Sequence, residues 1–170
     1  VVCRRQRQMC IRDRQKGFEI FLSDIGKIKQ KYKNVLTHNA IEWEEEKHSE
    51  KRFFEADIIV KSPGIPDTIP LIQDLKKASV PIISEIEFAA RYTDAKIIGI
   101  TGSNGKTTTA LLVGHMLKKA GLNVGVAGNV GDSFALQVAN ESHDFYVLEL
   151  SSFQLDGIDS FKPQIAILLN

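Results

Sequence analysis

The segment Thr101 to Thr109, Thr-Gly-Ser-Asn-Gly-Lys-Thr-Thr-Thr, has the residue types of a phosphate-binding loop. Its glycines allow a tight turn in which consecutive backbone N–H groups can face one anion. Lys106 adds an ammonium group, and the Thr107 hydroxyl suits Mg²⁺. The longer G-x-x-x-x-G-K-[ST] pattern is not met, because Ile100 stands where its first glycine would be. An ordinary turn that happens to carry a lysine is the alternative.

We expect this loop to bind the phosphates of a nucleoside triphosphate, with ATP and Mg²⁺ as the cofactors. Lys106 is the candidate catalytic residue, because its charge would neutralise a phosphoryl group in transfer. The predicted ATP contacts are Gly102, Ser103, Asn104, Gly105, Lys106, Thr107 and Thr108.

A carboxylate, Glu149, stands near the end of the apolar run Phe145 to Leu150. Burying a charge without compensation costs several kcal/mol, so a carboxylate in this place is seldom idle. We expect Glu149 to bind Mg²⁺ together with Thr107, at the strand ends that hold the phosphates. A structural, hydrogen-bonded glutamate is the alternative.

Three further loops follow apolar runs. Ligands of parallel sheets sit beyond the carboxyl ends of the strands, which makes Ser23-Asp24 and Ser62-Pro63-Gly64 candidate contacts. In Ala127-Gly128-Asn129-Val130-Gly131, the glycines would let the backbone approach a ligand closely. Simple loops and a tight turn without a ligand are the alternatives.

Apolar runs alternate with helical stretches, which is the rhythm of parallel α/β sheets. The expected strands are Phe18 to Ser23, Ala56 to Ser62, Val80 to Ser84, Lys96 to Ile100, Asn123 to Ala127, Phe145 to Leu150 and Gln164 to Leu169. The expected helices are Thr68 to Ala78, Glu85 to Tyr92, Thr107 to Ala120 and Asp132 to Asn140, with Gly121 as a C-terminal cap.

We infer an α/β fold with a Rossmann-like parallel-sheet domain at residues 15–93 and the first part of a phosphate-loop ATPase domain at residues 94–170. The boundary is expected near Tyr92 to Ala95, where a helix ends in a short polar link. The charged segment Glu42 to Arg52 is interpreted as a solvated helix or loop face. The arginine-rich start, residues 1–14, departs from the rhythm and is interpreted as non-native sequence; a nucleic-acid arm or a transit peptide are the alternatives.

The composition is that of a soluble globular protein. The 170 residues are 43% hydrophobic and carry a net charge of +1, without the bias of a nucleic-acid or membrane protein. No apolar run approaches the roughly 20 residues of a membrane span. We therefore expect a cytoplasmic monomer with no nucleic-acid or membrane partner.

Four strings together, TGSNGKTT, GNVG, LELSSFQL and SPGIP, resemble the Mur ligase family of peptidoglycan synthesis. The resemblance covers about Gly17 to Asn170. TGxNGKTT is shared by sister ligases and by folylpolyglutamate synthases, whereas LELSSFQL is the discriminating string. The resemblance implies an amino-terminal UDP-binding domain followed by the first part of a central ATPase domain.

The same resemblance implies an ATP-dependent amide ligase whose partners are UDP-N-acetylmuramoyl-L-alanine and D-glutamate. ATP would phosphorylate the L-alanyl carboxylate, and the D-glutamate amine would then attack the acyl phosphate. The implied substrate contacts are Asp24, Gly64, Asn129, Gln154 and Ser151, with Ser152 as the alternative to Ser151.

The resemblance also implies segments that are not in this sequence. A glycine-rich turn for the UDP diphosphate should precede Phe18. A histidine, a carbamylated lysine, an adenine pocket and a carboxy-terminal domain should follow Asn170. We therefore expect the 170 residues alone not to turn over. The rival hypotheses are another amide ligase of this ATPase design, with a different amino acid or a folate substrate, and a nonenzymatic nucleotide-binding module that holds nucleic acid.

Overall fold

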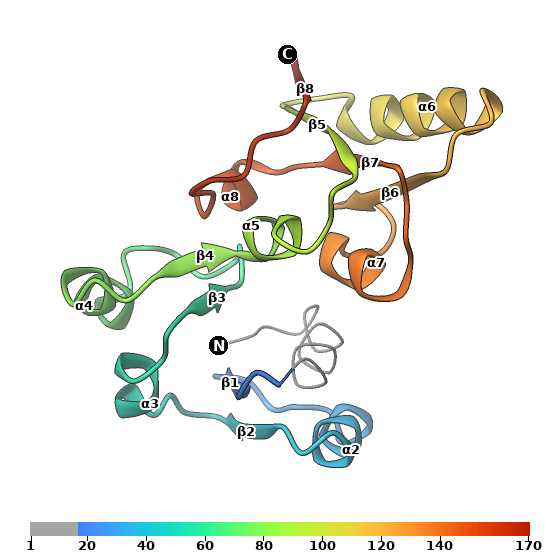
Figure 1. Ribbon diagram of the computed structural model, residues 1–170. Coiled ribbons are helices and arrows are strands. Elements are labelled where there is room, and N and C mark those ends of the chain that lie inside the picture. Colours follow the sequence, from blue (N-terminus) through green and yellow to red (C-terminus); the bar gives the residue numbers. More distant parts are fainter. Residues whose placement is uncertain (1–16) are drawn as a thin grey trace. The chain divides into compact units, whose positions relative to one another are not determined.

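The computed structural model describes residues 17–170, and its contacts divide the chain between Ile83 and Ser84 into two compact units. Both units are α/β (Figure 1). The segment 1–14, interpreted as non-native, lies outside the described residues, and that interpretation stays a prediction. Within residues 17–170, no helix is both long enough and apolar enough to cross a membrane.

The first unit alternates short strands with helices. From residue 17 on, its elements are β1 (Phe21–Asp24), α2 (Gln30–His38), β2 (Glu42–Glu45), α3 (Glu50–Phe54), β3 (Ile59–Lys61), α4 (Pro70–Lys77) and β4 (Ile82–Ser84). Strands β1 and β2 pair in parallel, and β3 neighbours β4 in a second two-stranded sheet. The three strands expected in this unit are present, with shorter bounds than the apolar runs indicated.

Within the described part of the first unit, apolar side chains form two clusters. One gathers Leu22, Ile28, Leu36 and Ile41, so that helix α2 packs on the β1–β2 pair. The other joins α3, β3 and α4 through Phe53, Ile59 and Leu75.

The interpretation of Glu42 to Arg52 as a solvated helix or loop face is wrong for its first half, which forms strand β2. Successive strand residues face opposite sides, so Trp43 packs on the cluster around Leu22 while Glu44 faces the other way. Glu44 is buried and accepts hydrogen bonds from Ser23 and from both the backbone and the hydroxyl of Ser49. Burial alone would raise the pKa of Glu44, but these hydrogen bonds outweigh it and lower the pKa. The sequence therefore did not predict this strand, because its charged composition is typical of an exposed surface.

The second unit contains one four-stranded parallel sheet. Its elements are α5 (Glu85–Ala90), β5 (Lys96–Gly102), α6 (Lys106–Lys119), β6 (Val124–Gly128), α7 (Phe134–Asn140), β7 (Phe145–Glu149), α8 (Ser152–Leu155) and β8 (Ile165–Leu169). The strand order is β6-β7-β5-β8, and every pairing is parallel. The four strands expected here are present, and Gly121 follows α6 in a left-handed conformation with φ +82°.

Helices α6 and α7 cover opposite faces of this sheet. Val147 belongs to the cluster that packs on Ala110 of α6, whereas the neighbouring Tyr146 contacts Phe134 of α7, with ring centroids 5.0 Å apart. The alternation of side chains along β7 explains this arrangement. All-parallel sheets are covered on both faces, which accounts for the nearly continuous apolar runs of the sequence.

Helix α5 belongs to the second unit, although the sequence suggested a boundary after it, near Tyr92 to Ala95. The backbone N–H of Ser84, the N-cap residue just before α5, donates to the carbonyl of Gly157 at 2.7 Å. Glu85 and Glu87 also bond to backbone groups of the second unit. These hydrogen bonds join α5 to the second unit, and the sequence does not display them.

Candidate functional site

The predicted phosphate loop connects the end of β5 with the start of α6 in the second unit (Figure 1). Gly102 has φ +136°, and a Cβ at this position would lie 2.0 Å from the backbone oxygen of Leu169. Gly105 caps the helix with φ +79°. Residues with a side chain rarely adopt such conformations, so the shape of this loop depends on both glycines.

The start of α6 is suited to an anion. The first N–H groups of a helix have no partner within the helix, and the helix dipole places partial positive charge there. Lys106, the first residue of α6, donates from Nζ to the carbonyls of Gly102 at 2.7 Å and Ser103 at 3.0 Å. Its ammonium group therefore lies over the loop, and Ser103, Asn104, Thr107 and Thr108 are exposed around it.

Thr107 and Glu149 meet in the structure. The Thr107 hydroxyl donates a 2.8 Å hydrogen bond to Glu149 Oε2. Glu149 is the last residue of β7, lies opposite Ile100 of β5, and is only 6% exposed. The buried carboxylate is therefore compensated by a side chain of the phosphate loop, and the two candidate Mg²⁺ ligands are neighbours.

The oxygen atoms of Thr107 and Glu149 fit a hard divalent cation. Mg²⁺ is commonly held by one or two protein oxygens together with substrate phosphates and water. Among residues 17–170, no group of three or more histidine, cysteine, aspartate or glutamate side chains could hold a metal ion.

The Asn129 turn lies at the same end of the sheet. Gly128 pairs with Glu149, and a Cβ on Gly128, where φ is +100°, would lie 2.2 Å from the Glu149 backbone oxygen. The same oxygen accepts the Asn129 N–H at 3.0 Å. The turn is thus pressed against the end of β7, and the Asn129 side chain is exposed.

Two domain matches cover most of the chain. Residues 100–170 match the Mur ligase middle domain, and residues 8–69 match the MurD N-terminal domain. The chain belongs to the Mur ligase family. The first match contains Thr107, Asn129 and Glu149, and the second contains Asp24 and Gly64.

Curated Mur ligases of several bacteria are similar to this chain. The UDP-N-acetylmuramoylalanine–D-glutamate ligase of Christiangramia forsetii is 59% identical over 157 residues, which are 92% of this chain and 35% of the relative. The ligase of the same name from Bacteroides fragilis is 61% identical over 155 residues, which are 91% of this chain and 35% of the relative. The chain thus spans about a third of the length of these relatives.

Solved Mur ligase structures share the fold. The UDP-N-acetylmuramate:L-alanyl-gamma-D-glutamyl-meso-diaminopimelate ligase of Neisseria meningitides aligns with a TM-score of 0.55 and 22% identity, over 95% of this chain and 56% of that one. A murein peptide ligase of Psychrobacter arcticus aligns with a TM-score of 0.51 and 20% identity, over 95% and 39% of the two chains. These likenesses confirm the expected α/β fold class.

In this Mur ligase chain, Ser151 and Gln154 form the capping box of helix α8. Gln154 is buried, and its Oε1 accepts from the Ser151 backbone N–H at 2.9 Å and from the Ser151 hydroxyl at 3.1 Å. Both predicted substrate residues thus shape the turn after Glu149. The neighbouring Ser152 is exposed.

Asp24 and Gly64 belong to the first unit of this Mur ligase chain and lie in two separate loops there. Asp24 Oδ1 accepts the Gly26 N–H at 2.9 Å, which fixes the turn after β1. Gly64 is exposed in a turn closed by a 3.0 Å hydrogen bond from Ile65 N–H to the Ser62 carbonyl. Their ligand contacts stay predictions.

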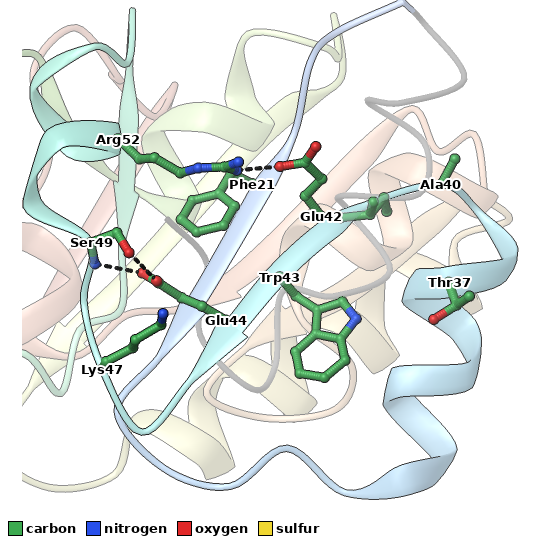
Figure 2. Close-up of a pocket in the computed structure, with 10 residues that line it drawn as sticks. Phe21, Thr37, Ala40, Glu42, Trp43, Glu44, Lys47, Ser49 and Arg52 are labelled. Atoms are coloured by element: carbon green, nitrogen blue, oxygen red, sulfur yellow. Dashed lines mark hydrogen bonds and ion pairs between the residues drawn. The ribbon is translucent and has the colours of Figure 1, made fainter.

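The first unit also contains a pocket of about 670 Å³ beside β2 (Figure 2). Arg52 forms an ion pair with Glu42 there, and its guanidinium lies over the Phe21 ring, 4.3 Å from the centroid. Neither Asp24 nor Gly64 lines this pocket. The predicted substrate contacts of the first unit therefore do not coincide with it.

Sequence reasoning missed two buried carboxylates of this Mur ligase chain, Glu85 and Glu87 in helix α5. Glu87 is fully buried and Glu85 is 6% exposed. Acidic residues are common in the first turn of a helix, so the sequence gives no sign that these two are buried. The backbone N–H groups that donate to them lie at least 50 residues away in sequence.

Proposed function

We propose that this chain supplies the ATP phosphate site, the Mg²⁺ ligands and part of the substrate site of an ATP-dependent ligase. The ligase would join D-glutamate to UDP-N-acetylmuramoyl-L-alanine. The observation that carries the proposal is the contact between Thr107 and Glu149 beside the phosphate loop. The names and the identity of the Christiangramia and Bacteroides relatives support the choice of substrates.

The reaction needs no nucleophile from the protein. A carboxylate oxygen of the L-alanyl group attacks the γ-phosphorus of ATP, ADP leaves, and an acyl phosphate forms. The D-glutamate amine then attacks the acyl carbon, phosphate leaves, the amine loses a proton, and an amide remains. The task of the protein is to position these groups and to stabilise charge.

Each residue of the loop has a defined part in this proposal. The N–H groups at the start of α6 bind the β- and γ-phosphates. The Lys106 ammonium, which now bonds the loop carbonyls of Gly102 and Ser103, turns to the phosphoryl group in transfer. Thr107 and Glu149 hold Mg²⁺, which when bound neutralises charge on the phosphates.

The substrate contacts belong to the same proposal. Asn129 presents an exposed amide at the end of the sheet that holds Glu149. The Oε1 atom of Gln154 is bonded by Ser151, which leaves its Nε2 as the donor for the muramoyl substrate. Asp24 and the turn at Gly64 contact the UDP part, which places the nucleotide at the loops of the first unit.

The proposal is tested with a longer protein that contains this chain and has the full length of the curated relatives. The measurement is the release of phosphate from ATP. We expect release only when ATP, Mg²⁺, UDP-N-acetylmuramoyl-L-alanine and D-glutamate are all present. Meso-diaminopimelate, lysine and L-alanine should not replace D-glutamate. Turnover with one of these amines, and not with D-glutamate, would assign the site to another amide ligase.

A further inference from the structure

Helix α5 carries two carboxylates that the proposed reaction does not use. Glu85 and Glu87 are both buried, and each accepts hydrogen bonds from a different segment of the second unit. One segment follows the Asn129 turn, and the other follows the helix that contains Gln154. Both carboxylates are therefore connected to elements that carry predicted substrate contacts.

The Glu85 carboxylate bonds to the first turn of helix α7. Its Oε1 accepts the Ala135 N–H at 2.5 Å. Helix α7 begins directly after the turn that contains Asn129, and the other side of this turn is fixed by the 3.0 Å bond from Asn129 N–H to the Glu149 carbonyl. The Asn129 turn is thus held between Glu149 on one side and, through α7, Glu85 on the other.

The Glu87 carboxylate bonds to the connection between α8 and β8. It accepts three consecutive backbone N–H groups, from Asp159 at 3.1 Å, Ser160 at 3.0 Å and Phe161 at 2.7 Å, and the Ser160 hydroxyl at 2.6 Å. Arg91, one turn later on α5, donates to the same carboxylate at 3.1 Å.

A third contact joins the start of α5 to the end of α8. The Ser84 N–H donates to the Gly157 carbonyl at 2.7 Å. A Cβ at position 157 would lie 2.9 Å from the Ser84 backbone nitrogen, so only glycine fits the observed approach. The segment after Gln154 is therefore fixed to α5 at Gly157 and again at residues 159–161.

Packing alone does not require carboxylates at these positions. Buried charges carry a desolvation cost that well-packed apolar side chains avoid. A carboxylate that accepts several N–H groups does what an apolar side chain cannot, because its hydrogen bonds fix the direction of each backbone group. The observed geometry is thus suited to hold two segments in one arrangement.

We propose that Glu85 and Glu87 form a carboxylate clamp that positions the Asn129 turn and the Ser151–Gln154 segment for the UDP-muramoyl substrate. They are positioning residues and touch no reacting atom. The proposal rests on the function proposed above, because it assumes that these two segments contact that substrate. Neither carboxylate bonds to the phosphate loop, so the clamp acts on substrate binding and leaves the ATP site unchanged.

The clamp is tested by the kinetics of three variants, made in the longer protein that has the full length of the curated relatives. Glu85→Gln and Glu87→Gln replace each carboxyl group by an amide, and Ser160→Ala removes one hydrogen bond to Glu87 with less risk to folding. We expect Glu87→Gln to raise KM for UDP-N-acetylmuramoyl-L-alanine by about tenfold or more, with smaller increases for the other two. KM for ATP should stay within about twofold.

Asp94→Asn is the matched control, because Asp94 is exposed and lies just after α5. Glu87→Asp keeps the charge and should recover part of the affinity for the muramoyl substrate. Folded variants with an unchanged KM for that substrate, or with equal rises in both KM values, would overturn the clamp. If Glu87→Gln does not fold, Ser160→Ala and Glu85→Gln decide. Wild-type protein without D-glutamate-dependent turnover would instead reject the proposed function.

Discussion

Thr107 Oγ1 donates a hydrogen bond of 2.8 Å to Glu149 Oε2, although the two residues are 42 positions apart in sequence. Thr107 lies in the first turn of α6, and Glu149 ends β7. The pairing of β7 with β5 sets this distance, because it places Glu149 opposite Ile100, just before the phosphate loop. A hydroxyl and a buried carboxylate thus face one another where the loop would hold phosphate.

Thr107→Val should weaken Mg²⁺-dependent ATP binding, because valine keeps the shape of threonine but lacks the hydroxyl. Loss of a hydrogen bond to a charged group typically costs about 1.5–3 kcal/mol, or roughly 10- to 150-fold in affinity. Titration of the chain with ATP, with and without Mg²⁺, measures the effect. Thr107→Ser keeps the hydroxyl and should bind nearly as the wild type does.

Glu149→Gln should change the Mg²⁺ dependence of the same titration, since an amide is a weaker ligand for a hard cation than a carboxylate. We expect the Mg²⁺ concentration for half-maximal ATP binding to rise by about tenfold or more. Glu55→Gln, at an exposed position of the first unit, is the control. An unaltered Mg²⁺ dependence in Glu149→Gln would leave this carboxylate with a structural role only.

Lys106→Met should reduce the rate of phosphate release by about 10²- to 10³-fold, because removal of a single group that stabilises developing charge has this order of effect. Steady-state turnover of the longer protein, which has the full length of the curated relatives, measures this reduction in rate. Lys118→Met provides the matched control, since Lys118 lies near the other end of the same helix. Equal activities of the two variants would exclude a catalytic role for Lys106.

Gly102→Ala should destabilise the second unit by more than about 2 kcal/mol, because the new Cβ would meet the Leu169 backbone, in addition to the roughly 1–2 kcal/mol cost of a left-handed conformation. Gly121→Ala is the comparison. Gly121 has φ +82° but no atom within 4 Å of its built Cβ, so only the conformational cost applies. Urea unfolding followed by circular dichroism should therefore give a clearly lower free energy of unfolding for Gly102→Ala than for Gly121→Ala.

Glu85 should make stability depend on pH. Burial raises its pKa from 4.5 to about 7, partly offset by the hydrogen bond from Ala135 N–H. The folded state therefore keeps its proton where the unfolded state has lost it. The resulting stability is fully present below about pH 4.5 and is lost as pH rises through about 7, by roughly 3 kcal/mol in total.

Urea unfolding between pH 4.5 and 8 measures this loss. Glu85→Gln has no titrating proton at this position and should show a flatter profile. The titration of Glu87 does not contribute to this pH dependence of stability. Burial alone would raise its pKa, but hydrogen bonds from Ser160, Phe161 and Asp159 hold the pKa at about 2, so its contribution is constant above about pH 4.5. Parallel pH profiles of wild type and Glu85→Gln would contradict the prediction.

Strands with continuous apolar runs could be predicted from the sequence, because parallel strands covered on both faces leave a strong local signal. Runs such as Lys96 to Ile100 and Phe145 to Leu150 are strands at nearly the expected bounds. Strand β2 could not be predicted, since its Glu-Trp-Glu-Glu sequence has the composition of a solvated surface. Only the bonds to Glu44 from Ser23 and Ser49 show why a carboxylate is tolerated inside.

The candidate phosphate loop could be predicted from the sequence, because its glycines, Lys106 and Thr107 lie within nine consecutive residues, where local geometry suffices. Tertiary structure decided which distant groups join that loop. Strand pairing places Glu149 beside Thr107, and helix packing directs Glu85 and Glu87 to backbone N–H groups at positions 135 and 159–161. The physical reason is that burial and hydrogen bonding of a carboxylate depend on atoms brought from remote parts of the chain, which no local pattern records.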